Sequence, residues 1–139
     1  MAKINYVRMI LGALLGTVVI FIVGFLFQGV ILGSHHEFFI ERGAVLPQPR
    51  EMGWIAHIAG GIVCGLVLSF CYVIARKVRG PGAMTAILSG LVVALFTTGD
   101  MTAEFAFYNL GGMIPAMSLV NNIVGAILAS LAAAAFYKE

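Results

Sequence analysis

Four apolar segments, each long enough to cross a lipid bilayer, constrain the fold of this chain more than any other feature of its sequence. A helix of about 20 apolar residues spans the hydrocarbon core of a bilayer. In lipid every backbone N–H and C=O group needs a partner within the protein, and a helix supplies these partners by itself. The predicted spans cover residues 9–32, 54–75, 83–107 and 114–136. The sequence therefore predicts an all-α integral membrane protein, a four-helix bundle with short loops and one longer outer loop.

The composition agrees with a single transmembrane domain. Of the 139 residues, 61% are apolar and only 10% are charged, whereas about 25% of the residues of a soluble domain are charged. The first segment, residues 9–32, is longer than the core of a signal peptide, which has about 7–15 residues, and it lacks an Ala-x-Ala cleavage site. We therefore expect one domain over residues 1–139, with the first segment retained as a span.

The distribution of charge predicts the orientation of the spans. With four spans, both termini and the loop between the second and third spans lie on one side of the membrane. That side carries six of the eight basic residues, including Arg76, Lys77 and Arg79. The positive-inside rule then predicts a multi-pass protein of the cell's inner (cytoplasmic) membrane with both termini in the cytoplasm. These three basic residues act as topology signals, and they also suit contact with anionic lipid headgroups.

Small residues recur at four-residue spacing on every predicted span. Lipid provides no hydrophobic drive between helices, so close contact through small residues matters more than in water. The residues expected at helix–helix contacts are Gly12, Gly16, Gly61, Gly65, Gly90, Asn121, Asn122 and Gly125. On the fourth span, small and amide residues form two adjacent rows, from Ser118 to Ala134 and from Asn121 to Ala133. These rows are wider than one helix contact needs, which favours docking of other membrane helices or of a second copy.

Several ionisable residues are predicted to gather at the outer end of the bundle. They are His35, His36, His57, Asp100 and Glu104. Asp100 and Glu104 are one helical turn apart and share a face. Imidazole and carboxylate groups are ligands for zinc and similar ions, and intramembrane ionisable groups often relay protons. The residues therefore form a candidate metal or proton site, although their spacing matches no recognised metal motif. The alternative is that the loop residues are simply solvated and the carboxylates lie at the rim.

His57 has a second interpretation as a cofactor ligand. Small residues surround it in the segment Ala56-His57-Ile58-Ala59-Gly60-Gly61. A flat tetrapyrrole could lie against such residues with the imidazole as its axial ligand. A second histidine at matching depth on another predicted span is absent, which argues against a bis-histidine haem. A hydrogen bond to a neighbouring helix is the simpler role for this histidine, and the sequence leaves any cofactor unknown.

Two stretches of the chain carry a resemblance to a known family. The first is Asn5-Tyr6-Val7-Arg8 with Leu11-Gly12, and the second runs from Tyr72 through Arg76 to Gly80-Pro81-Gly82, followed by Thr85-Ala86 and Gly90-Leu91. They resemble a family of small four-span bacterial integral membrane proteins of unknown function, known as hypothetical membrane proteins. At Ala83 and Met84 the family pattern tends instead to Pro-Lys. The resemblance implies the same architecture and no particular activity.

The sequence contains none of the common enzyme motifs. A phosphate-binding glycine loop, a Cys-x-x-Cys pair, a His-Glu-x-x-His helix and a Gly-x-Ser-x-Gly elbow are all absent. No extended basic face suits nucleic acid.

We therefore expect a non-enzymatic accessory or structural subunit that packs against other membrane helices. The alternatives are a small-solute, proton or divalent-metal transport or binding protein using the outer site, and a tetrapyrrole-binding subunit using His57. A transporter would need deeper polar residues, for which Asn121 and Asn122 are the candidates.

Thiol labelling tests the predicted orientation. In a cysteine-free parent, a cysteine placed at Ser34 or Gln48 should react with a membrane-impermeant thiol reagent in intact cells, because residues 33–53 are predicted to lie outside. A cysteine at Lys77 should react only after the cells are permeabilised. The reverse labelling pattern would put both termini on the outer side.

Overall fold

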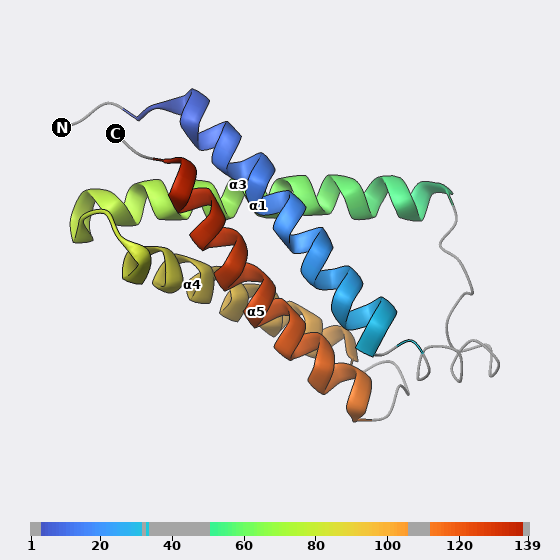
Figure 1. Cartoon of the computed structure of the whole chain (residues 1–139). Helices are drawn as coiled ribbons and strands as arrows, with labels where there is room; N and C mark the ends of the chain where they lie inside the picture. The colour runs from blue at the N-terminus through green and yellow to red at the C-terminus, as the bar shows by residue number, and fades with distance from the viewer. Residues whose placement is uncertain (1–3, 32, 34–50, 106–111, 138–139) are drawn as a thin grey trace.

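Four long helices make up most of the chain. The computed structural model describes residues 4–31, 33, 51–105 and 112–137, with helices α1 (Tyr6–Phe25), η1 (Leu26–Ile31), α3 (Glu51–Arg79), α4 (Ala83–Phe105) and α5 (Met113–Phe136) (Figure 1). No strand occurs among these residues. Four helical segments within them are long and apolar enough to cross a membrane. The chain is a multi-pass membrane protein, and the predicted all-α four-helix bundle is confirmed.

The helix α3 is longer than the predicted span of residues 54–75. It has 29 residues, and Arg76, Lys77 and Arg79 belong to its last turn rather than to a loop. Cations near the C-terminus of a helix interact favourably with the helix dipole, so these side chains support the extension. The helix ends at Gly80, whose φ of 85° lies in the left-handed region that favours glycine. The connection to α4 is therefore only three residues long, Gly80 to Gly82.

The first span also begins earlier than residue 9. Asn5 is the N-cap of α1, and its side chain accepts a hydrogen bond from the N–H of Arg8 at 3.1 Å. Asparagine is among the preferred N-cap residues because its carbonyl satisfies a free N–H of the first turn. At the other end, α1 continues into the π-helix η1 over Leu26–Ile31. The predicted first span thus corresponds to α1 and η1 together.

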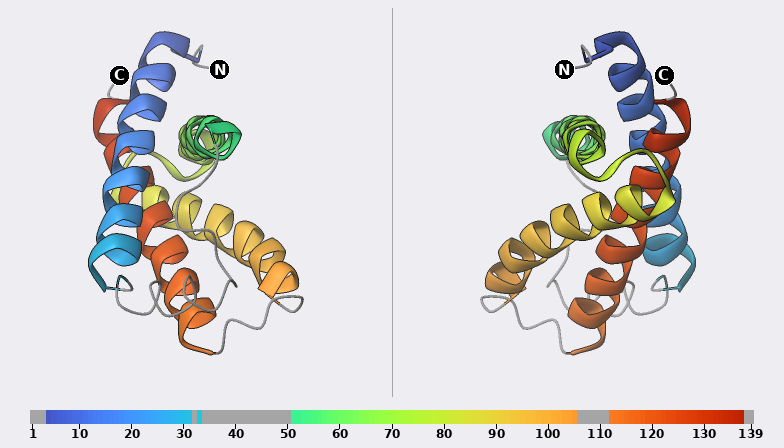
Figure 2. Two further views of the ribbon diagram at one scale, coloured as in Figure 1. Left: turned by 90° about the vertical axis from the view of Figure 1, so that its right-hand side faces the viewer. Right: turned by 90° about the vertical axis from the view of Figure 1, so that its left-hand side faces the viewer.

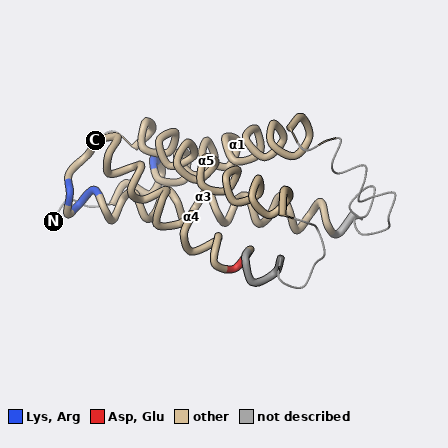
Figure 3. Tube along the Cα trace, turned by 90° about the horizontal axis from the view of Figure 1, so that it is seen from below, with Lys and Arg blue, Asp and Glu red and all other residues tan. Residues whose placement is uncertain are grey.

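The helices alternate in direction, so two ends of the bundle can be distinguished. One end, which we call the terminal end, holds the start of α1, the end of α3, the start of α4 and the end of α5 (Figure 1). The described Lys and Arg residues gather there (Figure 3). The other end, which we call the opposite end, holds η1, the start of α3, the end of α4 and the start of α5. Asp100 belongs to the half of α4 nearer this opposite end.

The helix α5 is the centre of the bundle. It packs along both α1 and α4, and α1 also packs along α3, whereas α3 makes shorter contacts with α4 and α5. Figure 2 shows α1 and α5 side by side, with α4 diverging from α1 toward its Phe105 end. In Figure 1, α3 crosses α1, so that the first part of α3 extends away from the other helices. The residues from Gly53 to Gly60 on this part are all exposed.

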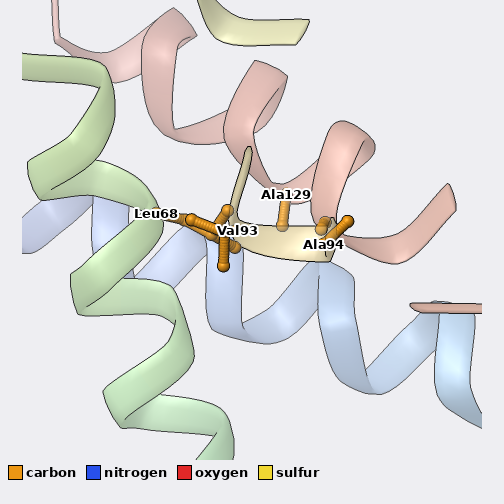
Figure 4. Close-up of a cluster of buried hydrophobic side chains, with 5 residues drawn as sticks. Leu68, Val93, Ala94 and Ala129 are labelled. Carbon is orange, nitrogen blue, oxygen red and sulfur yellow. The ribbon is translucent and has the colours of Figure 1, made fainter. Parts of the chain in front are cut away.

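Small side chains fill the interior. The central cluster consists of Leu68, Val93, Ala94, Ala126 and Ala129 (Figure 4). Most large apolar side chains point outward instead, and Phe96 on α4 is 81% exposed. A soluble protein would bury such residues, but lipid solvates them. The distribution of side chains is therefore that of a helix bundle surrounded by acyl chains.

Glycines lie where the helices approach most closely. A Cβ atom added at Gly65 of α3 would lie 2.5 Å from the carbonyl oxygen of Ala13, and one at Gly90 of α4 would lie 2.7 Å from that of Ala126. Cβ atoms added at three further glycines would also lie within 3.2 Å of a neighbour: Gly12 of Ala133, Gly16 of Ala129, and Gly61 of Phe21. By contrast, a Cβ atom at Gly125 would make an ordinary contact of 3.6 Å with Val23. Five of the six glycines predicted at helix contacts therefore leave no room for a side chain unless their neighbours shift.

Paired alanine substitutions on α3 test this packing. Gly65→Ala should lower the free energy of unfolding in detergent by about 1–3 kcal/mol, because the new methyl group collides with the backbone of α1. Gly60→Ala is the matched control, since a Cβ atom at Gly60 would have no neighbour within 4 Å. Thermal unfolding followed by circular dichroism measures both variants. Equal melting temperatures for the two variants would contradict the close contact of α1 with α3.

Candidate functional site

The two rows of small and amide residues on α5 face different helices of the same chain. Ala129 and Ala133 lie against Gly16 and Gly12 of α1. In the other row, Ala126 lies against Gly90 of α4. The sequence predicts an outside partner for this double surface, but α1 and α4 occupy it instead. The width of the surface follows from the central position of α5 and does not indicate docking of another protein on this helix.

A polar cluster joins α4 and α5 in the half of the bundle nearer the opposite end. The Asn122 Nδ2 donates to Thr97 Oγ1 at 2.8 Å and to Thr98 Oγ1 at 3.0 Å. Thr97 Oγ1 lies 3.2 Å from Asn122 Oδ1, so it can donate in return. The sequence predicts a packing role for Asn122 but does not single out the threonines. Thr97 and Asn122 are similarly distant along the chain from the α4–α5 connection. In two adjacent antiparallel helices, such residues are expected at the same depth, so the sequence did contain a signal for this pair.

Asn121 differs from its neighbour in its surroundings. Its side chain is half-buried, and its Oδ1 atom is buried without a hydrogen-bond partner among the described residues. Adjacent residues on a helix point in directions about 100° apart, so Asn121 cannot join the Asn122 cluster. A buried carbonyl without a partner costs stability. The two amides therefore differ in their contacts: the Asn122 side chain joins α4 and α5 by hydrogen bonds, whereas the Oδ1 of Asn121 has no partner among the described residues.

His57 lies on the exposed first part of α3, in contact with aromatic rings. Its ring centroid lies 5.4 Å from that of Phe21 on α1 and 6.4 Å from that of Trp54. The Phe21 ring also fills the space beside Gly61. That space is part of the surface predicted for a flat tetrapyrrole, so a cofactor at His57 could not lie against Gly61, whereas Ala56, Ala59 and Gly60 are exposed.

The predicted outer metal or proton site falls only partly within the described residues. Asp100 is exposed on α4, and His57 is exposed on α3. His35 and His36 lie outside the described residues, as does the side chain of Glu104. Among the described side chains, no three His, Cys, Asp or Glu residues come close enough to hold a metal ion. The site therefore stays a prediction from the sequence.

One face of α3 is exposed along most of its length. Gly53, Ala56, Gly60, Val63 and Val67 follow one another at spacings of three and four residues, and all five are exposed. We call these five residues the open face of α3. Residues at such spacings share one side of a helix. The open face begins with three small residues at the opposite end and continues with two valines toward the centre of the membrane span.

At the terminal end, Tyr137 connects three helices. Its ring is 3% exposed, and its hydroxyl accepts a hydrogen bond from the N–H of Asn5 at 3.0 Å. Its carbonyl oxygen accepts from Arg76 Nη1, and the guanidinium carbon lies 5.3 Å from the centre of the Tyr137 ring. Of the three predicted topology signals, Arg76 is thus half-buried, while Lys77 and Arg79 are exposed. No pattern in the sequence indicates this cluster, because Arg76 and Tyr137 are 61 positions apart.

Comparison with protein-family models, with curated proteins and with solved structures finds no match to this chain.

Leucine substitutions at the adjacent asparagines distinguish their roles. Asn122→Leu should lower the free energy of unfolding by about 0.6–1.7 kcal/mol, the range measured for hydrogen bonds between membrane helices, because Thr97 and Thr98 lose their shared partner. Asn121→Leu should leave stability unchanged or raise it, because it removes a buried carbonyl without a partner. Unfolding in mixed micelles measures both variants. An unchanged free energy of unfolding for Asn122→Leu would show that the cluster does not hold α4 to α5.

Proposed function

We propose that this chain is a non-enzymatic integral membrane protein, an accessory or structural subunit that packs against the membrane helices of another protein. The partner would dock on the open face of α3. The observation that carries this proposal is the run of Gly53, Ala56 and Gly60 on a helix face whose residues are all exposed. Small residues expose little apolar surface to lipid, but they let another helix approach closely.

The other glycines of the chain support this interpretation of the open face. Gly12, Gly65 and Gly90 lie at close contacts between helices, so in this bundle small residues at helical spacing can mark a contact. A Cβ atom added at Gly24 or at Gly99 would also have no neighbour within 4 Å, but neither glycine belongs to a run of three small residues on one exposed helix face. Among the residues whose exposure the structure describes, three small residues follow one another at helical spacing on an exposed face only on α3. A helix from outside the chain would give them the contact that the other small residues have.

The polar residues within the span favour packing over transport. A transporter requires polar groups that remain available to a solute near the middle of the membrane. The side chains of Asn122 and Thr97 are hydrogen-bonded to each other and to backbone carbonyls of α4. Such a cluster stabilises the α4–α5 contact and offers few free groups to a solute. The function of a transport or metal-binding protein stays an alternative that rests on the predicted outer site and on Asn121, whose Oδ1 has no hydrogen-bond partner among the described residues.

We further propose that the chain lies in a bacterial inner membrane with both termini in the cytoplasm. The charges of the described residues support this orientation. Arg8, Arg76, Lys77 and Arg79 all belong to the terminal end, whereas Asp100 belongs to the other half of the bundle. The positive-inside rule assigns the basic end to the cytoplasm.

Purification from native membranes tests the proposed docking. A tagged wild-type chain, extracted in mild detergent, should co-purify with another membrane protein in a fixed ratio, as measured by mass spectrometry of the intact complex. Gly60→Leu should reduce the recovered partner by about tenfold or more, because a large side chain keeps the two helices apart. Gly99→Leu is the matched control, since Gly99 is also exposed but lies on α4.

The melting temperature of each variant is also measured, so that a loss of docking is not mistaken for a loss of folding. Both glycines have open space around them, so both variants should fold as the wild type does. A wild-type chain that elutes without any partner would contradict the proposal, and so would equal partner recovery for Gly60→Leu and Gly99→Leu. A complex containing only copies of this chain would replace the accessory role with self-association.

A further inference from the structure

A pocket with a volume of about 460 Å³ lies where α3, α4 and α5 meet at the terminal end. Ligand pockets typically have volumes of about 300–1,000 Å³, so this one can hold a small group. Its polar wall includes Tyr72, Arg76 and Tyr137, and its apolar wall includes Leu131 and Ala134 of α5. The pocket thus places a cation beside apolar surface at one end of the membrane spans.

Arg76 is held in a fixed position in the wall of this pocket. Its Nη1 donates to the carbonyl oxygen of Tyr137, and its guanidinium lies against the Tyr137 ring. The Tyr137 ring in turn packs edge-on against Tyr72, with 6.5 Å between the ring centroids. A guanidinium carries five N–H donors in a plane and can serve several acceptors at once. Because these contacts orient the side chain, little additional entropy is lost when it binds a ligand.

The start of α4 contributes a second positive feature to the pocket. Gly82 and Ala83 line it, and Ala83 is the first residue of α4. The first N–H groups of a helix have no acceptor within the helix, and together with the helix dipole they favour an anion. The guanidinium of Arg76 and the start of α4 therefore both favour a negatively charged ligand.

We propose that this pocket binds the phosphate group of an anionic phospholipid. Arg76 and the first N–H groups of α4 hold the phosphate, and Leu131 and Ala134 contact the apolar part of the same lipid. A free phosphate ion would gain from the charges alone, whereas a lipid also covers the apolar wall. The pocket lies at the end of four spans, which is the level of the headgroups. This role is independent of docking on the open face of α3, which begins at the opposite end of the bundle.

Lipid-dependent thermal stability tests the proposal. The delipidated protein in neutral detergent is titrated with phosphatidylglycerol, with phosphatidylcholine of the same acyl chains, or with inorganic phosphate. Phosphatidylglycerol should raise the melting temperature in a saturable way, while the other two probes should have little effect. Arg76→Gln should weaken the apparent affinity for phosphatidylglycerol by about tenfold or more, because a charge-assisted contact is lost.

Two further variants separate the pocket from general surface charge and from misfolding. Ala83→Asp puts a carboxylate at the start of α4, where it suits the helix dipole, so the protein should fold normally yet lose the response to phosphatidylglycerol. The double variant Lys77→Gln/Arg79→Gln removes two exposed charges of α3 and should keep the response.

The outcomes distinguish the sources of phosphate. A response that depends on Arg76 and Ala83 but not on Lys77 and Arg79 supports the proposal. An equal shift with inorganic phosphate would identify a free phosphate site and overturn the lipid assignment. Equal losses in all variants would show surface attraction only, and the absence of any response in the wild type would also refute the pocket as a lipid site.

Discussion

Close approach of helix backbones through small residues is the constraint on which the rest of this structure depends. In lipid, burial of large apolar side chains gives helices no reason to associate. The bundle therefore relies on van der Waals contacts at short range, such as those of Gly12 with Ala133 and of Gly90 with Ala126. Because α5 carries small residues on two sides, it can lie between α1 and α4 and contact both along their length. The large apolar residues are left to face the acyl chains.

Hydroxyl groups reinforce the same close contacts. The Thr17 hydroxyl of α1 lies 2.9 Å from the carbonyl oxygen of Ala13 on its own helix and 3.2 Å from that of Gly61 on α3, so its proton is shared between the two. Ser69 of α3 donates to the carbonyl oxygen of Met9 on α1 at 2.8 Å. A short side chain reaches a carbonyl of the next helix only if the two backbones are near each other. The glycines and the hydroxyl groups therefore depend on one another: the glycines bring the helices together, and the hydrogen bonds fix their relative position.

The sequence predicts the helices well because the thickness of the bilayer sets their length. It also indicates which glycines lie at contacts, since Gly61 and Gly65 recur at the spacing of a helix face. What it does not determine is which helix each face meets, and for that reason both rows on α5 suggested an outside partner. The Arg76–Tyr137 contact joins residues 61 positions apart, and no periodic pattern reports such a pair. Of the predicted outer site, the described side chains of His57 and Asp100 do not by themselves form a ligand group.

The position of Tyr137 has a consequence for the order in which the bundle is assembled during synthesis. This residue follows α5, yet it binds the start of α1 and the end of α3. Those two helices can pair as soon as both are in the membrane, through Gly65 and Thr17. Their terminal ends nevertheless remain without their shared partner until the ribosome has passed α5. The terminal end of the bundle is therefore expected to be completed last.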